Sequence, residues 1–135
     1  MGFTKPSRVQ AQSLPMILLP PYRHLIAQAH NGSGKTTCFV LGMLSRVDAA
    51  VAKPQALCMC PTRELVVQNA QVLQKMGTHT RITCATTAAA SASSSSHRSA
   101  ASSRMPPIVD QVVIGTPGSI INWIAKRILP LRCVP

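Results

Sequence analysis

The run Ala29-His30-Asn31-Gly32-Ser33-Gly34-Lys35-Thr36 restricts the possible folds of this chain most strongly, because it has the pattern of a phosphate-binding loop. Such a loop follows a buried strand and opens a helix. Residues 24–28 have the composition of a short buried strand, and apolar residues from Lys35 to Asp48 recur at helical spacing. The context therefore predicts a strand, a loop and a helix that hold the phosphates of a nucleoside triphosphate.

The loop residues have separate chemical roles. Gly32 and Gly34 allow backbone N–H groups to turn toward phosphate oxygens. Lys35 reaches the terminal phosphates, and the hydroxyl of Thr36 binds the Mg²⁺ that accompanies the nucleotide. The positive end of the following helix faces the same anion. The predicted nucleotide-binding residues of this segment are Ala29, Asn31, Gly32, Ser33, Gly34, Lys35, Thr36 and Thr37.

Acidic residues are scarce: the chain has Asp48, Glu64 and Asp110 only. No two of them are adjacent, so no Asp-Glu pair is present to position Mg²⁺ and an attacking water. The sequence thus favours binding and argues against complete chemistry. A GTPase would need an Asn-Lys-x-Asp guanine reader, which is absent, and a small kinase would need a carboxylate to orient its acceptor.

Composition limits the class of protein. With 135 residues, of which 46% are hydrophobic, the chain allows one domain at most. The net charge of +11 suits a polyanion such as RNA. The charge is unusual because only three residues are acidic, whereas 14 basic residues are an ordinary number for a chain of this length. Apolar runs are too short to span a membrane, and no secretory signal is visible. Five cysteines without zinc spacing indicate reduced thiols in an intracellular protein.

Hydrophobic periodicity predicts an α/β fold with a parallel sheet flanked by helices, because strands alternate with helices. The helix with the clearest apolar side, which contains Leu65 and Val66, is expected to end at Gly77. In the first helix we expect Ser7 to be the N-cap and Pro15 to interrupt the helix. Helices are expected at 7–18, 35–48, 62–76 and 119–127, and strands at 24–28, 55–60, 81–86 and 111–114.

Residues 88–104 differ from the rest of the chain, because they are rich in Ser and Ala and have no hydrophobic period. This low-complexity segment is predicted to be a mobile loop that interrupts the domain. It is either a surface loop without a partner or a basic loop that touches RNA through His97, Arg98 and Arg104.

Four short stretches, taken in order, resemble motifs of the DEAD-box RNA helicases. Residues 2–10 resemble the Q motif, 29–36 the phosphate loop, 61–65 motif Ia and 116–118 motif Ib. Runs at 14–18, 25–29 and 112–116 are most similar to the mRNA-export subgroup. The resemblance covers residues 1–85 and 106–126 and implies a RecA-like domain.

The resemblance also implies ligands. Gln10 and Phe3 would recognise adenine, with Pro6 fixing the turn, and Lys5 would also bind the nucleotide, so that ATP with Mg²⁺ is the expected cofactor. The expected partners are single-stranded RNA, bound without sequence preference, and export or translation factors, in the nucleus and cytoplasm and not at a membrane. The residues implied to bind RNA are Pro61, Thr62, Arg63, Glu64, Thr116, Pro117 and Gly118.

Departures from the family pattern matter equally. The family continues with an Asp-Glu-Ala-Asp strand, a Ser-Ala-Thr motif and a second RecA-like domain, none of which occurs in these 135 residues. We therefore expect a partial helicase ATP-binding domain over 1–127, an unstructured tail over 128–135, and no ATP hydrolysis by the chain alone. The alternatives are a non-catalytic nucleotide- or RNA-binding fragment, a truncated gene product without function and, less favoured, an unrelated phosphate-loop kinase or NTPase.

Overall fold

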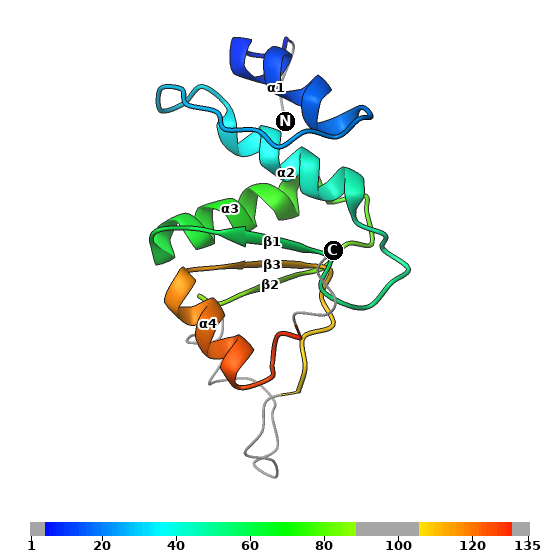
Figure 1. Ribbon diagram of the computed structural model, residues 1–135, viewed down its shortest axis with the longest axis vertical. Helices are drawn as coiled ribbons and strands as arrows, with labels where there is room; N and C mark the ends of the chain where they lie inside the picture. The colour runs from blue at the N-terminus through cyan, green and yellow to red at the C-terminus, as the bar shows by residue number, and fades with distance from the viewer. Residues whose placement is uncertain (1–4, 89–105, 131–135) are drawn as a thin grey trace. The chain divides into compact units, whose positions relative to one another are not determined.

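The computed structural model describes residues 5–88 and 106–130 (Figure 1). The chain divides into two units, residues 1–46 and residues 47–135. The first unit contains two helices and the second contains a three-stranded sheet with two further helices. In chain order the elements are α1 (Arg8–Leu18), α2 (Lys35–Arg46), β1 (Ala56–Met59), α3 (Arg63–Met76), β2 (Cys84–Thr86), β3 (Val112–Gly115) and α4 (Pro117–Ala125).

The sheet of the second unit has the order β1-β3-β2, and both pairs of strands are parallel. The central strand β3 is buried along its whole length, and its β-branched residues are typical of a buried parallel strand. Val113 is its midpoint and pairs in register with Leu57 of β1 and Ala85 of β2. The predicted α/β fold with a parallel sheet flanked by helices is confirmed.

Helices α3 and α4 cover opposite faces of this sheet (Figure 1). On the α4 side, Val113 packs with Ile120, Trp123, Ile128 and Leu129. The prediction that a tail begins at residue 128 is wrong for Ile128 and Leu129, which are 4% and 1% exposed. The chain turns back after α4, and the N–H groups of both residues donate to the Trp123 carbonyl at 2.9 and 3.2 Å. Residues 131–135 lie outside the described residues.

Helix α3 has the predicted ends. Thr62 is its N-cap and accepts from the Leu65 N–H at 3.4 Å, while the N–H of Gly77 donates to the Leu73 carbonyl at 2.8 Å. The buried side of the helix consists of Val66, Asn69, Ala70 and Leu73. Leu65, which was expected on the apolar side, is 37% exposed because it lies one position away from this stripe.

The first unit is formed by α1 and α2, which pack against each other. A Cβ atom at Gly42 of α2 would lie 2.7 Å from Cγ2 of Ile17, so this glycine permits the close approach. Pro15 does not interrupt α1 as predicted, because the helix continues to Leu18. The proline removes one backbone donor, and the N–H of Leu19 still donates to the Pro15 carbonyl at 3.1 Å.

The predicted buried strand at residues 24–28 is wrong. These residues are not in a strand, they lie at the surface, and Ile26 is fully exposed, with a relative exposure of 101%. A strand requires a neighbour for its backbone groups, and no strand within 5–88 or 106–130 pairs with this segment. The apolar side chains of Leu25 and Ile26 are therefore exposed.

Element bounds differ modestly from those predicted. Helix α4 begins at Pro117 rather than Ser119, because proline suits the first helical position, and α2 ends at Arg46. Strand β2 is limited to Cys84–Thr86. Most of the Ser/Ala-rich segment lies outside the described residues. None of the helices in the described part of the chain is long and apolar enough to cross a membrane.

Candidate functional site

The phosphate loop precedes α2 and has the backbone conformation that its sequence predicts. Gly32 has φ +78° and Gly34 has φ +91°, values that side chains with a Cβ rarely adopt. Lys35 is the first residue of α2, so the loop leads directly into the N-terminus of that helix. The N–H groups of a first helical turn have no partners within the helix and are available to an anion.

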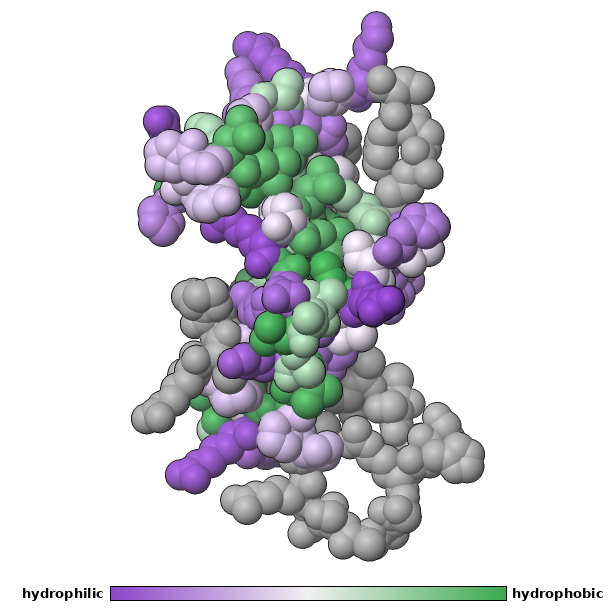
Figure 2. Space-filling view, turned by 90° about the vertical axis from the view of Figure 1, so that its right-hand side faces the viewer, coloured by the Kyte–Doolittle hydropathy of each residue, from purple (hydrophilic) through white to green (hydrophobic). Residues whose placement is uncertain are grey.

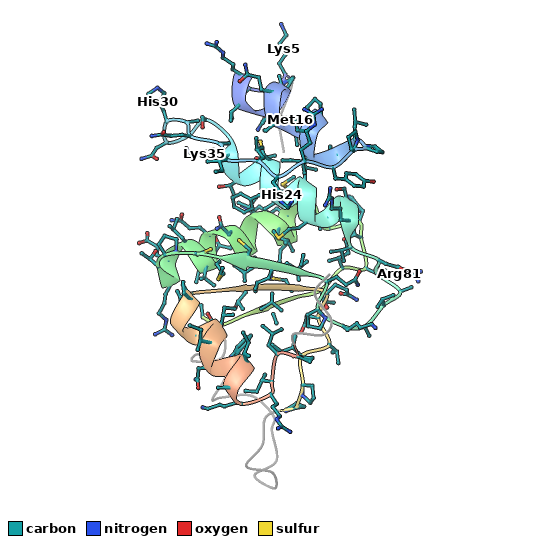
Figure 3. All side chains as sticks on the ribbon, in the orientation of Figure 1. Lys5, Met16, His24, His30, Lys35 and Arg81 are labelled. Carbon is teal, nitrogen blue, oxygen red and sulfur yellow. The ribbon has the colours of Figure 1, made fainter. Side chains whose placement is uncertain are left out.

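The ammonium of Lys35 folds over the loop itself. Its Nζ donates to the carbonyl oxygen of Ala29 and, at 2.7 Å, to that of His30. Figure 3 shows Lys35 and His30 in this part of the first unit. The cation is therefore held by two carbonyl oxygens of the loop itself, and phosphate oxygens would compete with these carbonyls for it.

Helix α1 is joined to the loop through its N-cap. The hydroxyl of Ser7 donates to the Ser33 carbonyl at 2.7 Å, and Nε2 of Gln10 donates to the Gly34 carbonyl at 3.4 Å. The same two side chains form a capping box: Oε1 of Gln10 accepts from the Ser7 N–H at 2.9 Å. Ser7, the predicted N-cap, and Gln10, the predicted nucleotide-binding glutamine, are thus both hydrogen-bonded to the phosphate loop.

Two further residues support the loop and were not predicted from the sequence. The buried hydroxyl of Ser13 donates to the Val9 carbonyl at 2.6 Å and lies 3.2 Å from the sulfur of Cys38. The thiol of Cys38 in turn donates to the Gly34 carbonyl at 3.6 Å. The available signal was Ser13, a polar residue that occupies a buried position of α1.

The other predicted nucleotide-binding residues vary in setting. Lys5 and Asn31 are exposed, Thr36 and Thr37 are half-buried, and Phe3 lies outside the described residues. The hydroxyl oxygen of Ser33 is buried and has no hydrogen-bond partner. An unsatisfied hydroxyl, two glycines with positive φ and a lysine at a helix start fit the phosphates of a nucleotide. Within the described ranges no three His, Cys, Asp or Glu side chains lie together so that they could hold a metal ion.

The predicted RNA-binding residues gather at the carboxyl edge of the sheet in the second unit. Met59 and Gly115 end β1 and β3 and are partners in the register, and the Cys60 N–H donates to the Gly115 carbonyl at 2.9 Å. Immediately beyond these ends, Thr62 opens α3 and Thr116 opens α4. Two helix N-termini therefore begin beyond the same edge of the sheet, one on each face. The exposed residues of this edge are Pro61, Thr62, Arg63, Glu64, Pro117 and Gly118.

The two helix starts are built differently. Thr62 caps α3 with its side chain, whereas the hydroxyl of Thr116 donates to the Ser119 hydroxyl at 3.1 Å and caps no backbone group of α4. Glu64 is the only acidic residue in the first turn of α3, and its Oε1 accepts from Nε2 of Gln68 at 3.4 Å. The first backbone N–H groups of each helix have no acceptor within the helix itself.

Three thiols lie on the α3 face of the sheet. Cys58 lies in β1 and Cys60 follows its end, with their sulfurs 3.9 Å apart, and Nδ2 of Asn69 donates to the Cys60 sulfur at 3.1 Å. Burial, and then the neighbouring Cys60, raises the pKa of Cys58 to about 12. Burial, and then the charge of Asp110, raises the pKa of Cys84 to about 12. The thiols of Cys58 and Cys84 are therefore protonated near neutral pH.

Comparison with known proteins places the chain among helicases. The family model described as DEAD/DEAH box helicase matches residues 7–134. The DEAD-box ATP-dependent RNA helicase 38 of Oryza sativa subsp. japonica is 59% identical over 130 residues, which are 96% of this chain and 25% of that protein. The ATP-dependent RNA helicase dbp5 of Schizosaccharomyces pombe is 41% identical over 132 residues, 98% of this chain and 24% of that protein.

Solved structures agree with the sequence comparison. The S. cerevisiae Dbp5 bound to RNA and ADP BeF3 has a TM-score of 0.80 and 36% identity, over 98% of this chain and 31% of that chain. A second structure, S. cerevisiae dbp5 L327V bound to nup159, gle1 H337R, IP6 and ADP, has a TM-score of 0.81 and 36% identity, with 98% of this chain and 32% of that chain covered. The chain spans about a quarter of the length of the curated relatives it matches.

Proposed function

Because the chain belongs to the DEAD/DEAH box helicase family, we propose that it is part of an ATP-dependent RNA helicase. Its first unit binds ATP at the phosphate loop, and its second unit binds RNA at the carboxyl edge of the sheet. The single observation that carries the proposal is the loop itself, with Gly32 and Gly34 at positive φ and Lys35 at the start of α2.

Adenine recognition is assigned to Gln10. Its amide uses one N–H on Gly34 and one lone pair on Ser7, which leaves one donor and one acceptor for an adenine edge. Because Gln10 is hydrogen-bonded to the loop, the amide proposed to read the base lies close to the residues proposed to bind the phosphates. Phe3 would lie on the ring, as the family resemblance implies.

Hydrolysis by the chain alone is not expected. Mg²⁺ would be held by the Thr36 hydroxyl and by the nucleotide's own phosphates, and it would neutralise phosphate charge. The 135 residues contain no Asp-Glu pair to fix the metal and activate water. This observation favours the second candidate function, a non-catalytic fragment that binds nucleotide and RNA without turnover.

RNA binding is assigned to the starts of α3 and α4. Thr62, Arg63, Thr116 and Gly118 offer hydroxyl, guanidinium and backbone N–H groups directed at phosphates, with few means of reading bases. Support comes from the likeness to Dbp5, whose solved structure contains RNA. Binding without sequence preference follows from this chemistry.

Partners and location are proposed from relatives. A similar yeast structure is described as bound to nup159 and gle1. We extend this to the present chain only as a proposal that it meets export factors, acting in the nucleus and cytoplasm.

The test is a pair of measurements on the purified chain. A fluorescent ATP analogue should bind with micromolar or weaker affinity and be displaced by ATP, and Lys35→Ala should weaken this binding about tenfold or more. ATP hydrolysis, measured with and without RNA, should stay at background. Absence of binding by the unmutated chain, which has a complete loop, would overturn the nucleotide assignment. Turnover that Lys35→Ala removes would overturn the non-catalytic assignment.

A further inference from the structure

The segment between α1 and the phosphate loop exposes an aromatic ring beside cationic side chains. Tyr22 is 58% exposed and Leu19 is 60% exposed, and the guanidinium carbon of Arg46 lies 4.0 Å from the centroid of the Tyr22 ring. Arg23 and Arg46 are themselves exposed. We call Leu19, Tyr22, Arg23 and Arg46 the Tyr22 surface. All four belong to the first unit.

Two hydrogen bonds to backbone carbonyls hold this surface in place. Nη2 of Arg46 donates to the Ile17 carbonyl at 3.2 Å, and the N–H of Arg23 donates to the Met16 carbonyl at 3.2 Å. The guanidinium is therefore fixed by its own hydrogen bond while it covers the ring. Because little ordering is needed on contact, a partner would meet a preformed platform.

The charge of the unit selects the sign of the partner. Residues 1–46 contain no Asp or Glu and have five basic residues, Lys5, Arg8, Arg23, Lys35 and Arg46. An anionic partner is therefore attracted and a cationic one is repelled. Figure 2 shows that hydrophobic residues, in green, are also exposed on the face of the protein turned toward the viewer.

We propose that the Tyr22 surface is a second contact site for single-stranded RNA, separate from the starts of α3 and α4. One base stacks on the exposed part of the Tyr22 ring, and Arg23 and Arg46 meet the adjoining phosphates. Single-stranded nucleic acid combines a flat aromatic face with a negative charge at every residue, which matches this pairing of ring and guanidinium. An acidic peptide would match the charge but not the ring.

The test uses the whole chain and a labelled twelve-residue oligouridine. Tyr22→Ala should weaken binding about fivefold or more because a stacking partner is lost, and Tyr22→Phe should keep the affinity within twofold. Arg23→Ala should lower the slope of log affinity against log salt by about one. Arg81→Ala removes an equal charge from an exposed loop of the second unit, and the loss of affinity caused by Tyr22→Ala should be the same in that background.

Crosslinking separates this site from the carboxyl edge. With 4-thiouridine in the probe, a crosslinked peptide should contain Tyr22, the only tyrosine of the chain, and it should persist in Arg63→Ala. Loss of the Tyr22 crosslink in Arg63→Ala would show that the two sites are not separate and overturn the proposal. So would equal affinities of Tyr22→Ala and Tyr22→Phe, or displacement of the probe by polyglutamate as readily as by unlabelled oligouridine.

Discussion

Nε2 of Gln10 donates to the carbonyl oxygen of Gly34 at 3.4 Å, so the residue assigned to adenine also holds the phosphate loop. The N-cap Ser7 repeats this link at the Ser33 carbonyl, and Gln10 closes the cap onto Ser7. The residue proposed to read the base and the phosphate loop are therefore joined by hydrogen bonds through the first turn of α1.

Gln10→Ala should weaken the binding of inorganic tripolyphosphate by roughly two- to tenfold, because one hydrogen bond to the loop is lost. It should also narrow the difference between ATP and GTP affinities. Isothermal titration with all three ligands measures both effects. Gln12→Ala, at an exposed position of the same helix, is the matched control and should change neither. Unchanged tripolyphosphate affinity in Gln10→Ala would show that the amide only reads the base.

Lys35→Ala should reduce ATP and tripolyphosphate affinity about tenfold or more, because a charge-assisted contact with phosphate is removed. Lys53→Ala removes an equal charge from an exposed position and should have little effect. Equilibrium dialysis of the two variants against labelled ATP is sufficient. Equal losses of ATP affinity in both variants would show that Lys35 contributes only its general positive charge.

Arg63→Ala should weaken binding of single-stranded RNA and lower the salt slope by about one. Binding should fall steeply as salt is raised, for every base sequence alike. Lys75→Ala, in the last turn of the same helix, serves as the control because that residue is far from the sheet edge. Affinity that survives high salt or depends on sequence would require a base-reading surface in place of the phosphate contacts.

Gly115→Ala should lower the free energy of unfolding by about 1–3 kcal/mol, because the added methyl overpacks the end of β3. A Cβ at this position would lie 2.7 Å from Cδ1 of Ile120 and close to Cγ2 of Thr87. Gly118→Ala, which meets nothing within 4 Å, should leave stability unchanged or raise it by up to about 1 kcal/mol. Urea unfolding of both variants provides the comparison.

Stability should fall as pH rises above about 9. The folded-state pKa values of Cys58 and Cys84 are raised from 9.0 to about 12, so the thiol form is favoured in the folded protein. This contribution is complete below pH 9 and is lost as pH rises toward 12. Urea unfolding at pH 7.5 and pH 10 should show the loss, and it should be smaller in the double variant Cys58→Ala, Cys84→Ala. An identical loss in that variant would assign it to other groups.

Local patterns predicted most of the helices and the sheet. Ser7 and Thr62 cap helices as their positions suggest, and the run at Val112–Gly115 forms the buried central strand. These features depend on residues that are close together in the sequence, so they can be predicted from the sequence alone. The loop glycines were found for the same reason, since phosphate binding imposes a fixed order of residue types.

Features that depend on distant residues were missed. The strand expected at residues 24–28 needs a partner strand, which no local pattern supplies. Burial of Ile128 and Leu129 depends on the return of the chain to Trp123. The need for glycine at position 115 arises from Ile120 and Thr87, which approach from two other elements. Each case is set by tertiary packing rather than by propensity.

The register between Met59 and Gly115 also sets a length scale. Neighbouring strands lie about 4.8 Å apart, so the chain leaves the sheet at two points one strand spacing apart before α3 and α4 begin on its opposite faces. A ligand held by both helix starts, as we propose for RNA, must therefore cross the edge of the sheet from one face to the other.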